Sequence, residues 1–192
     1  MELEPDEHTI DVMADAIRTL LVGIGEDPDR EGLADTPKRY AKALCELTSW
    51  TDVETTGILK TSFAGEGYDQ VVVVSGIPFN SLCEHHMLPF SGHVTVGYLP
   101  SERVVGLSKI PRLVNAYSHR LQIQERLTEQ IADTIHTELD ARGVGVIVTA
   151  HHTCMSMRGV KSHGNMTTSA MRGAMLDNAE TRAELLALHR EA

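Results

Sequence analysis

The stretch "GVGVIVTAHHTC", residues 143 to 154, is the feature of this sequence that most restricts how the chain can fold. Its β-branched residues predict a strand, and side chains two positions apart lie on the same face of a strand. One face then carries an apolar run that ends in a histidine and a cysteine: Val144, Val146, Val148, Ala150, His152 and Cys154. His151 and Thr153 fall on the opposite face. The apolar part belongs against a core and the polar end needs something to bind, so we interpret His152 and Cys154 as a matched pair.

Hydrophobic periodicity elsewhere predicts a protein that mixes helices and strands. The expected helices are 9–24, one starting at Thr36 and Pro37, one starting at Ser108, 124–141 and 178–190, and the expected strands are 71–77, 93–99, 143–154 and 166–171. Helices and strands come in pairs rather than in alternation, so the expected class is α+β. We expect residues 1–70 to form a helical arm with a connection, and residues 71–192 to form the main domain.

Composition and charge exclude several kinds of partner. The chain has 192 residues and a net charge of −10, which repels phosphate backbones and anionic lipids, so nucleic acid and membranes are not expected partners. The start "MELEPDEHTI" has no signal-peptide run, and no segment approaches the roughly 20 apolar residues of a membrane span, so we expect a cytoplasmic protein. Three cysteines, Cys45, Cys83 and Cys154, do not suggest a disulfide framework. Cys45 is interpreted as a packing residue.

The stretch "CEHH", residues 83 to 86, combines side chains with metal-ligand chemistry. Cys83 and His86 have the spacing at which one turn can direct two donors to the same ion. Cys154 would make a set of three and leave a fourth tetrahedral position for water, as in catalytic zinc sites. In the alternative, both cysteines are buried core thiols and His86 is a hydrogen-bonded turn residue; spacing alone does not separate the two. His85 and His152 are candidate proton carriers, because imidazole titrates near neutral pH.

Basic residues near the start of one predicted helix indicate an anion site. Ser108 and Lys109 open that helix, and Arg112 follows within its first turn. Free N–H groups and the positive end of the helix dipole favour phosphate there. Arg158 would extend the same site. The alternative for each is a solvated surface charge, which is the preferred interpretation for Lys161.

Glu125, in "LQIQERL", is a candidate for purine recognition. Guanine presents N1–H and its 2-amino group side by side, and one carboxylate can accept hydrogen bonds from both. The alternative is an exposed carboxylate on the opening turn of a helix.

Taken together, these stretches resemble the GTP cyclohydrolase I family. The matching segments, in the family's order, are "CEHHMLPFSGHVTVGYLP", "GLSKIPRLV", "QIQERLTEQIA" and "HTCMSMRGV", with weaker matches at "TTSAMRG" and "TPKRYAKAL". The resemblance implies a tunnelling fold, in which an antiparallel sheet with helices packed on one side follows an N-terminal helical arm. It also implies that subunits join their sheets into barrels and form a homodecamer with active sites between subunits. Allosteric control is a further implication.

The same resemblance implies a role for each matched residue. The expected ligands of one Zn2+ per subunit, with Fe2+ as an alternative ion in the cell, are Cys83, His86 and Cys154. The expected catalytic residues are His85, His152 and Ser108. The expected contacts to GTP are Gln124 and Glu125 for guanine, and Lys109, Arg112, Arg158 and Arg39 for the triphosphate. The implied reaction opens the imidazole ring of GTP with zinc-activated water, releases formate and yields 7,8-dihydroneopterin triphosphate, the first step of folate and tetrahydrobiopterin synthesis.

Two other interpretations stay open. One is another tunnelling-fold pterin enzyme, such as a pyruvoyl-tetrahydropterin synthase, although that family is expected to use three histidines for zinc and the third donor here is Cys154. The other is a catalytically inactive paralogue that binds GTP or a pterin. A cytidine deaminase is excluded, because Cys154 is followed by Met-Ser-Met and the second motif of such enzymes is missing.

Overall fold

The computed structural model describes residues 5–49, 55 and 57–190. The chain divides into two compact units, Met1–Val53 and Glu54–Ala192. The expected division into an arm and a main domain at residues 70 and 71 stays a prediction. Within the described residues, no helix combines the length and the apolar character that crossing a bilayer requires.

The N-terminal unit is a pair of helices, α1 (Glu7–Gly23) and α2 (Thr36–Leu47), close to the two predicted ones. α1 begins where the Asp6 carboxylate accepts a hydrogen bond from the Thr9 N–H at 2.7 Å. Asp35 rather than Thr36 is the N-cap of α2, and proline lies in its first turn, where a missing N–H costs nothing. The buried apolar residues of this unit are Ile10, Ala14 and Ala41.

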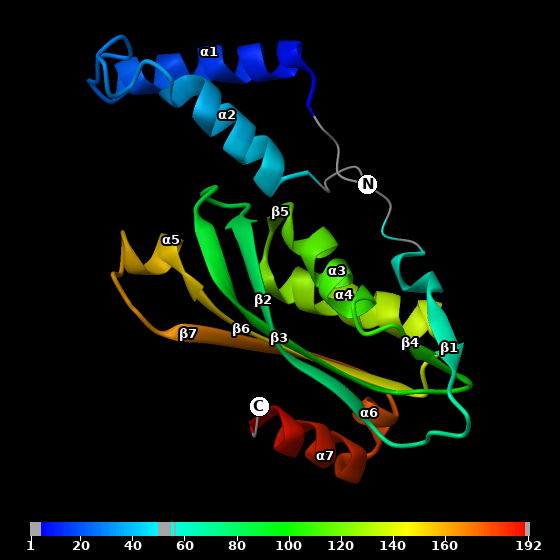
Figure 1. Ribbon diagram of the computed structural model, residues 1–192. Helices are drawn as coiled ribbons and strands as arrows, with labels where there is room; N and C mark the ends of the chain where they lie inside the picture. Colours follow the sequence, from blue (N-terminus) through cyan, green and yellow to red (C-terminus); the bar gives the residue numbers. More distant parts are fainter. Residues whose placement is uncertain (1–4, 50–54, 56, 191–192) are drawn as a thin grey trace. The chain divides into compact units, whose positions relative to one another are not determined.

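The larger unit is built on a five-stranded sheet with the strand order β5-β2-β3-β6-β7 (Figure 1). The strands are β2 (Val72–Cys83), β3 (Pro89–Leu99), β5 (Leu121–Gln122), β6 (Gly143–His152) and β7 (Asn165–Gly173). Neighbours pair antiparallel except β2 and β5, which are parallel. A separate ribbon pairs β1 (Ser62–Ala64) with β4 (Arg103–Val105), after the short helix η1 (Ile58–Lys60). The α+β class is confirmed.

One face of the sheet carries the main core, beneath α3 (Lys109–Ser118) and α4 (Gln124–Glu138). Alternate residues of β6 point into this core, as the period of two predicts, and Val144, Val146 and Val148 are fully buried. Leu113 of α3 and Ile131 of α4 belong to the same cluster. The predicted apolar face of the strand is therefore a real one.

The opposite face is covered at one end by α6 (Ala174–Asp177) and α7 (Ala179–Arg190). Gly97 and Gly145 make room for α7, because a Cβ at either position would overlap Leu185. Leu185 is completely buried and clusters with Val71 and Met175. The expected arrangement with helices on one side only needs correction: α7 buries its leucine against two glycines on the other face.

β6 ends sooner than the sequence indicates. The strand stops at His152, and Thr153–Ser156 forms the short helix α5. The Thr153 hydroxyl donates to the Pro89 carbonyl at 2.5 Å, which anchors the start of α5 against β3. Cys154 lies on this helix, so the argument that placed it on the strand face with His152 is wrong, although the two residues still lie at the same end of the sheet.

Candidate metal centre and active site

The "CEHH" residues form a tight turn between β2 and β3. The Cys83 N–H donates to the Leu88 carbonyl at 2.9 Å, and the Cys83 carbonyl accepts from the Met87 N–H at 2.7 Å. Met87 closes the turn with a left-handed φ of 52°, which few non-glycine residues adopt. These bonds fix Cys83 and His86 at the end of the sheet where β6 gives way to α5. We call residues 83–88 the metal turn.

Cys83, His86 and Cys154 come together in one cluster. One donor atom from each lies within 4.8 Å of the other two. Cys83 is buried, Cys154 is half-buried and His86 is exposed, so the cluster is reached from the histidine side. Two sulfurs and one imidazole nitrogen suit a borderline-soft ion such as zinc. The alternative of simple core thiols accounts for the burial of Cys83 but not for the convergence of three donors.

A metal ion in this cluster would compete with the proton of the Cys154 thiol. Burial raises the pKa of the Cys154 thiol, the neighbouring Cys83 thiol raises it further, and Arg158 opposes the shift. The Cys154 thiol therefore holds its proton until a metal ion displaces it. Metal binding here would therefore release protons and weaken as the pH falls.

His152 lies at the end of β6, held between an aromatic ring and a buried amide. It stacks on Phe90 with the ring centroids 4.7 Å apart and the planes at 4°, as expected for residues paired across β3 and β6. Its Nε2 lies 2.8 Å from Gln124 Oε1. Burial lowers the pKa of His152, Glu125 opposes this and His151 adds to it. The imidazole is therefore neutral at neutral pH.

Gln124 has its side-chain amide committed inside the protein. The residue is 1% exposed, and its amide nitrogen donates to the carbonyls of Val148 at 3.0 Å and Met166 at 3.1 Å. Carbonyl oxygens only accept, so the nitrogen must face them and the amide oxygen must face His152. Within this chain the side-chain amide of Gln124 is hydrogen-bonded at both of its polar atoms. The guanine contact expected from the sequence stays a prediction.

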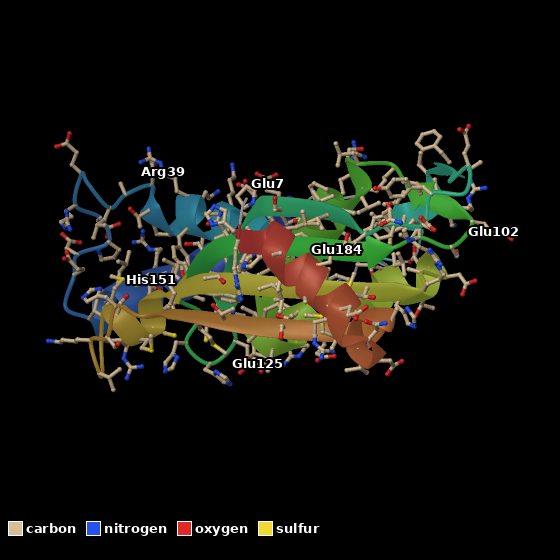
Figure 2. All side chains as sticks on the ribbon, turned by 90° about the horizontal axis from the view of Figure 1, so that it is seen from below. Glu7, Arg39, Glu102, Glu125, His151 and Glu184 are labelled. Carbon is tan, nitrogen blue, oxygen red and sulfur yellow. The ribbon has the colours of Figure 1, made fainter. Side chains whose placement is uncertain are left out.

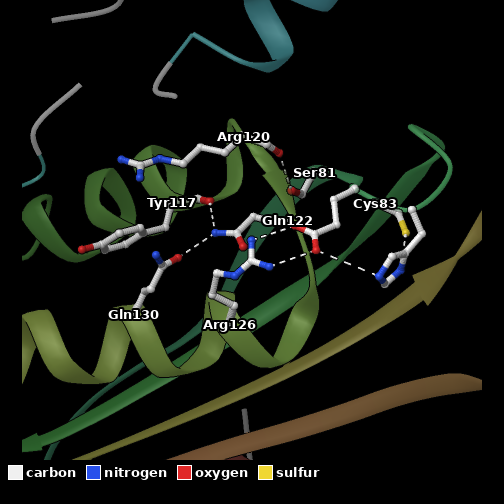
Figure 3. Close-up of polar contacts among 9 residues, drawn as sticks. Ser81, Cys83, Tyr117, Arg120, Gln122, Arg126 and Gln130 are labelled. Carbon is white, nitrogen blue, oxygen red and sulfur yellow. Dashed lines mark hydrogen bonds and ion pairs between the residues drawn. The ribbon is translucent and has the colours of Figure 1, made fainter. Parts of the chain in front are cut away.

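His85 and Glu84 also belong to the metal turn, close to Cys83 and Arg126, which Figure 3 labels. His85 Nδ1 lies 3.8 Å from Cys83 Sγ, and its Nε2 lies 4.0 Å from the Glu84 carboxylate. The guanidinium of Arg126 binds both oxygens of Glu84, at 2.8 and 3.0 Å. Its hydrogen bond lowers the pKa of Glu84. The Glu84 carboxylate is thus held in a fixed place between the histidines of the metal turn and α4.

The residues expected to bind GTP lie on separate elements. Glu125 projects from the first turn of α4 and is exposed (Figure 2). Ser108 is the N-cap of α3 but makes no capping hydrogen bond through its side chain, and Lys109 and Arg112 follow it. Among the described residues, no hydrogen bond or ion pair joins these three to the metal turn. Arg158 follows α5 and is exposed.

Arg39 lies in the N-terminal unit, on α2 (Figure 2). Its guanidinium pairs with Asp35 one turn earlier at 2.8 Å, and both side chains are exposed. The contact with the phosphates of a neighbouring subunit stays a prediction.

Two residues of the site were missed in the sequence. Phe90 shares the face of Val94 on β3, so extending the predicted strand backwards by its own alternation would have found it. Arg126 offers no such signal, because its partner Glu84 lies 42 positions away in the chain.

The fold and this set of side chains define an α+β protein with a Cys-His-Cys cluster able to hold a metal ion, at the same end of the sheet as an oriented histidine. Residues 13–190 match the model of the GTP cyclohydrolase I family. A relative named GTP cyclohydrolase 1 from Chlorobaculum tepidum is 50% identical over 184 residues, which cover 95% of this chain and 82% of the relative. Relatives of the same name from Coxiella burnetii and Campylobacter jejuni are 48% and 50% identical, over 93% and 91% of this chain and 98% and 92% of theirs. The chain belongs to the GTP cyclohydrolase I family.

Proposed function

We propose that this chain opens the guanine imidazole ring of GTP by hydrolysis, releases formate and, after rearrangement of the ribose, closes the ring of 7,8-dihydroneopterin triphosphate. The observation that carries the proposal is the convergence of Cys83, His86 and Cys154 within 4.8 Å, in a chain of this family. No observation favours another pterin enzyme or an inactive paralogue.

Zinc is the ion that the donor set suits best, held by Cys83, His86 and Cys154. Three protein ligands leave one tetrahedral position for water. When bound, zinc supplies Lewis acidity and lowers the pKa of water towards neutrality. Metal analysis of protein prepared without added metal distinguishes zinc from Fe2+.

Glu125 and His152 act on the purine. The Glu125 carboxylate accepts hydrogen bonds from guanine N1–H and the 2-amino group. Because His152 uses Nε2 to donate to Gln124, its Nδ1 is the nitrogen left to exchange a proton with the substrate. We assign to Nδ1, which carries no proton in the neutral ring, the uptake of a proton from the water that attacks C8 and the delivery of that proton to purine N7.

The ribose and the triphosphate fall to the remaining residues. His85 and Ser108 move protons while the ribose opens and rearranges. The first turn of α3 adds free N–H groups and a positive dipole end to the phosphate site. The basic side chains assigned to the triphosphate are Lys109, Arg112, Arg158 and, from a neighbouring subunit, Arg39.

The proposed working form is a homodecamer in the cytoplasm, with active sites between subunits. The assembly follows from the family, and the sheet supports it: in the described residues, β7 is paired on one side only. The compartment follows from the ligands, because thiolates persist where disulfides are reduced.

The decisive test is to incubate the purified, zinc-loaded assembly with GTP. We expect formate, and a fluorescent neopterin after oxidation of the product. ATP is the matched control substrate, because adenine lacks the N1–H and 2-amino pair that Glu125 reads. Absence of both products from GTP would refute the proposed activity.

A further inference from the structure

Glu84 and Arg126 connect the two halves of the proposed site (Figure 3). Glu84 follows the ligand Cys83 in the chain, and Arg126 follows Glu125 on the first turn of α4. Arg126 Nη1 and Nη2 donate to the two carboxylate oxygens of Glu84 at 2.8 and 3.0 Å. A planar guanidinium that grips both oxygens fixes direction as well as distance.

Main-chain contacts attach the start of the metal turn, Cys83 and Glu84, to β5. Cys83 pairs with Gln122 across β2 and β5, and the Glu84 N–H donates to the Gln122 carbonyl at 3.0 Å. Ser81 Oγ donates to the Arg120 carbonyl at 3.3 Å. In the part of the chain that the structure describes, Glu84–Arg126 is the one side-chain hydrogen-bonded link between residues 83–88 and α4. The turn is closed by its own backbone hydrogen bonds, and the Glu84–Arg126 link is what ties it directly to α4.

Stability does not explain this pair. The side chains of Arg126 and Glu84 are 42% and 32% exposed. Ion pairs this open to water contribute little to folding. Their geometric effect is larger, since His85 Nε2 lies 4.0 Å from the same carboxylate and a metal ligand lies on each side of the Glu84–His85 pair.

We propose that Arg126 is a positioning residue: through Glu84 it sets the place of the metal turn relative to the helix that carries Glu125. The proposal rests on the proposed function for its kinetic consequence. Its structural consequence does not depend on GTP at all.

The experiment compares four variants with the wild-type protein: Arg126→Gln, Glu84→Gln, the double variant and Arg126→Lys. Asp133→Asn is the matched control. Asp133 is an exposed carboxylate on the same helix, α4, but it binds Arg172 of β7, away from the metal turn. Each protein is measured for kcat and KM with GTP, and for the absorption bands of Co2+ bound in place of zinc, which report the geometry of thiolate and imidazole ligands.

We expect Arg126→Gln and Glu84→Gln each to lower kcat/KM about tenfold, in the range known for groups that orient metal ligands. The double variant should lose no more than the worse single variant, because both remove one interaction. Arg126→Lys should recover part of the loss, since it keeps the charge but not the fork. The Co2+ bands should change in both single variants and stay unchanged in Asp133→Asn.

Two results would overturn the proposal: additive losses in the double variant, or Co2+ bands in Arg126→Gln that match those of Asp133→Asn. If the wild-type protein does not turn over GTP, the proposed function fails. The Co2+ comparison then still decides whether Arg126 positions the metal turn.

Discussion

At the scale of single residues, the site depends on one buried amide with a forced orientation. Two backbone carbonyls, of Val148 and Met166, leave Gln124 only its oxygen to offer to His152. The histidine must then carry its proton on Nε2. Phe90 fixes the plane of the same ring. His152 therefore presents one defined nitrogen, in one defined direction, next to a set of metal ligands.

Ligand and proton carrier should separate by mutation. Cys154→Ser should lose both bound metal and turnover, because a serine hydroxyl is a poor zinc ligand. His152→Ala should keep its metal and lose turnover by roughly a hundredfold or more, the usual contribution of general acid–base catalysis. Metal analysis and formate release check this. Loss of zinc in His152→Ala would show that the assignment of the two roles is wrong.

The burial of His152 predicts a dependence of stability on pH. Its pKa is lowered from 6.5 by folding, so the unfolded chain binds a proton that the folded chain refuses. Above about pH 6.5 neither state binds this proton, so the free energy of unfolding is not reduced. As the pH falls from there to the folded-state pKa, the unfolded chain takes up the proton first and the free energy of unfolding decreases. His152→Gln should therefore lose less stability than wild type on acidification below about pH 6.5. Denaturant unfolding at several pH values measures this.

At the scale of elements, β6 serves two layers at once. Its even-numbered residues build the core under α3 and α4, and its odd-numbered Gly145 receives Leu185 of α7 on the other face. β6 packs on both faces because it carries valines on one face and, on the other, a glycine that leaves room for Leu185.

Gly145→Ala tests this two-sided packing. Its new Cβ would overlap Leu185, so we expect a loss of about 1–3 kcal/mol in the free energy of unfolding. Leu185→Ala alone should lose about 2–5 kcal/mol through the cavity it leaves. The double variant should lose clearly less than the two losses added, because the alanine methyl enters space vacated by the leucine. Simple additivity in thermal or denaturant unfolding would argue against the contact.

The elements also mark what sequence reasoning can reach. The face of Val144, Val146 and Val148 follows from a period of two, and it is observed. The same period failed at Cys154, because Thr153 bonds across to β3 and the chain turns into α5. Gly145 reads as a weak strand position until α7 is known to lie on it. The contacts of Gln124 with His152 and of Arg126 with Glu84 depend on the register of distant segments, which no local pattern encodes.

At the scale of the whole molecule, the residues of the proposed site come from both compact units. The metal ligands and His152 belong to the unit Glu54–Ala192, whereas Arg39 belongs to the unit Met1–Val53. We propose that Arg39 acts on the site of a neighbouring subunit, and this arrangement would link activity to assembly.

Mixed assemblies test the sharing of sites between subunits. Arg39→Ala and Cys154→Ser should each be impaired when assembled alone. Co-assembled from one expression host, they should regain turnover, because some sites then combine an intact arginine from one subunit with an intact metal centre from another. The matched control mixes Cys154→Ser with Cys83→Ser, which both damage the same centre and should not rescue each other. If the mixture of Arg39→Ala with Cys154→Ser also fails to regain turnover, Arg39 acts in the same chain as the site it serves.

The unequal edges of the sheet also bear on how the protein must be made. Among the described residues, β7 is paired on one side only and β2 is paired with β5 only at Leu82 and Cys83, so both ends of the sheet have strand edge that no other strand of the chain pairs with. In the proposed assembly, where subunits join their sheets, the folded subunit would behave in the language of polymer chemistry as a bifunctional monomer with two different ends. Growth by joining such ends stops when a ring closes, and otherwise continues as an open chain. The supply rate of new subunits relative to ring closure would then set the balance between finished rings and open oligomers in an expressing cell.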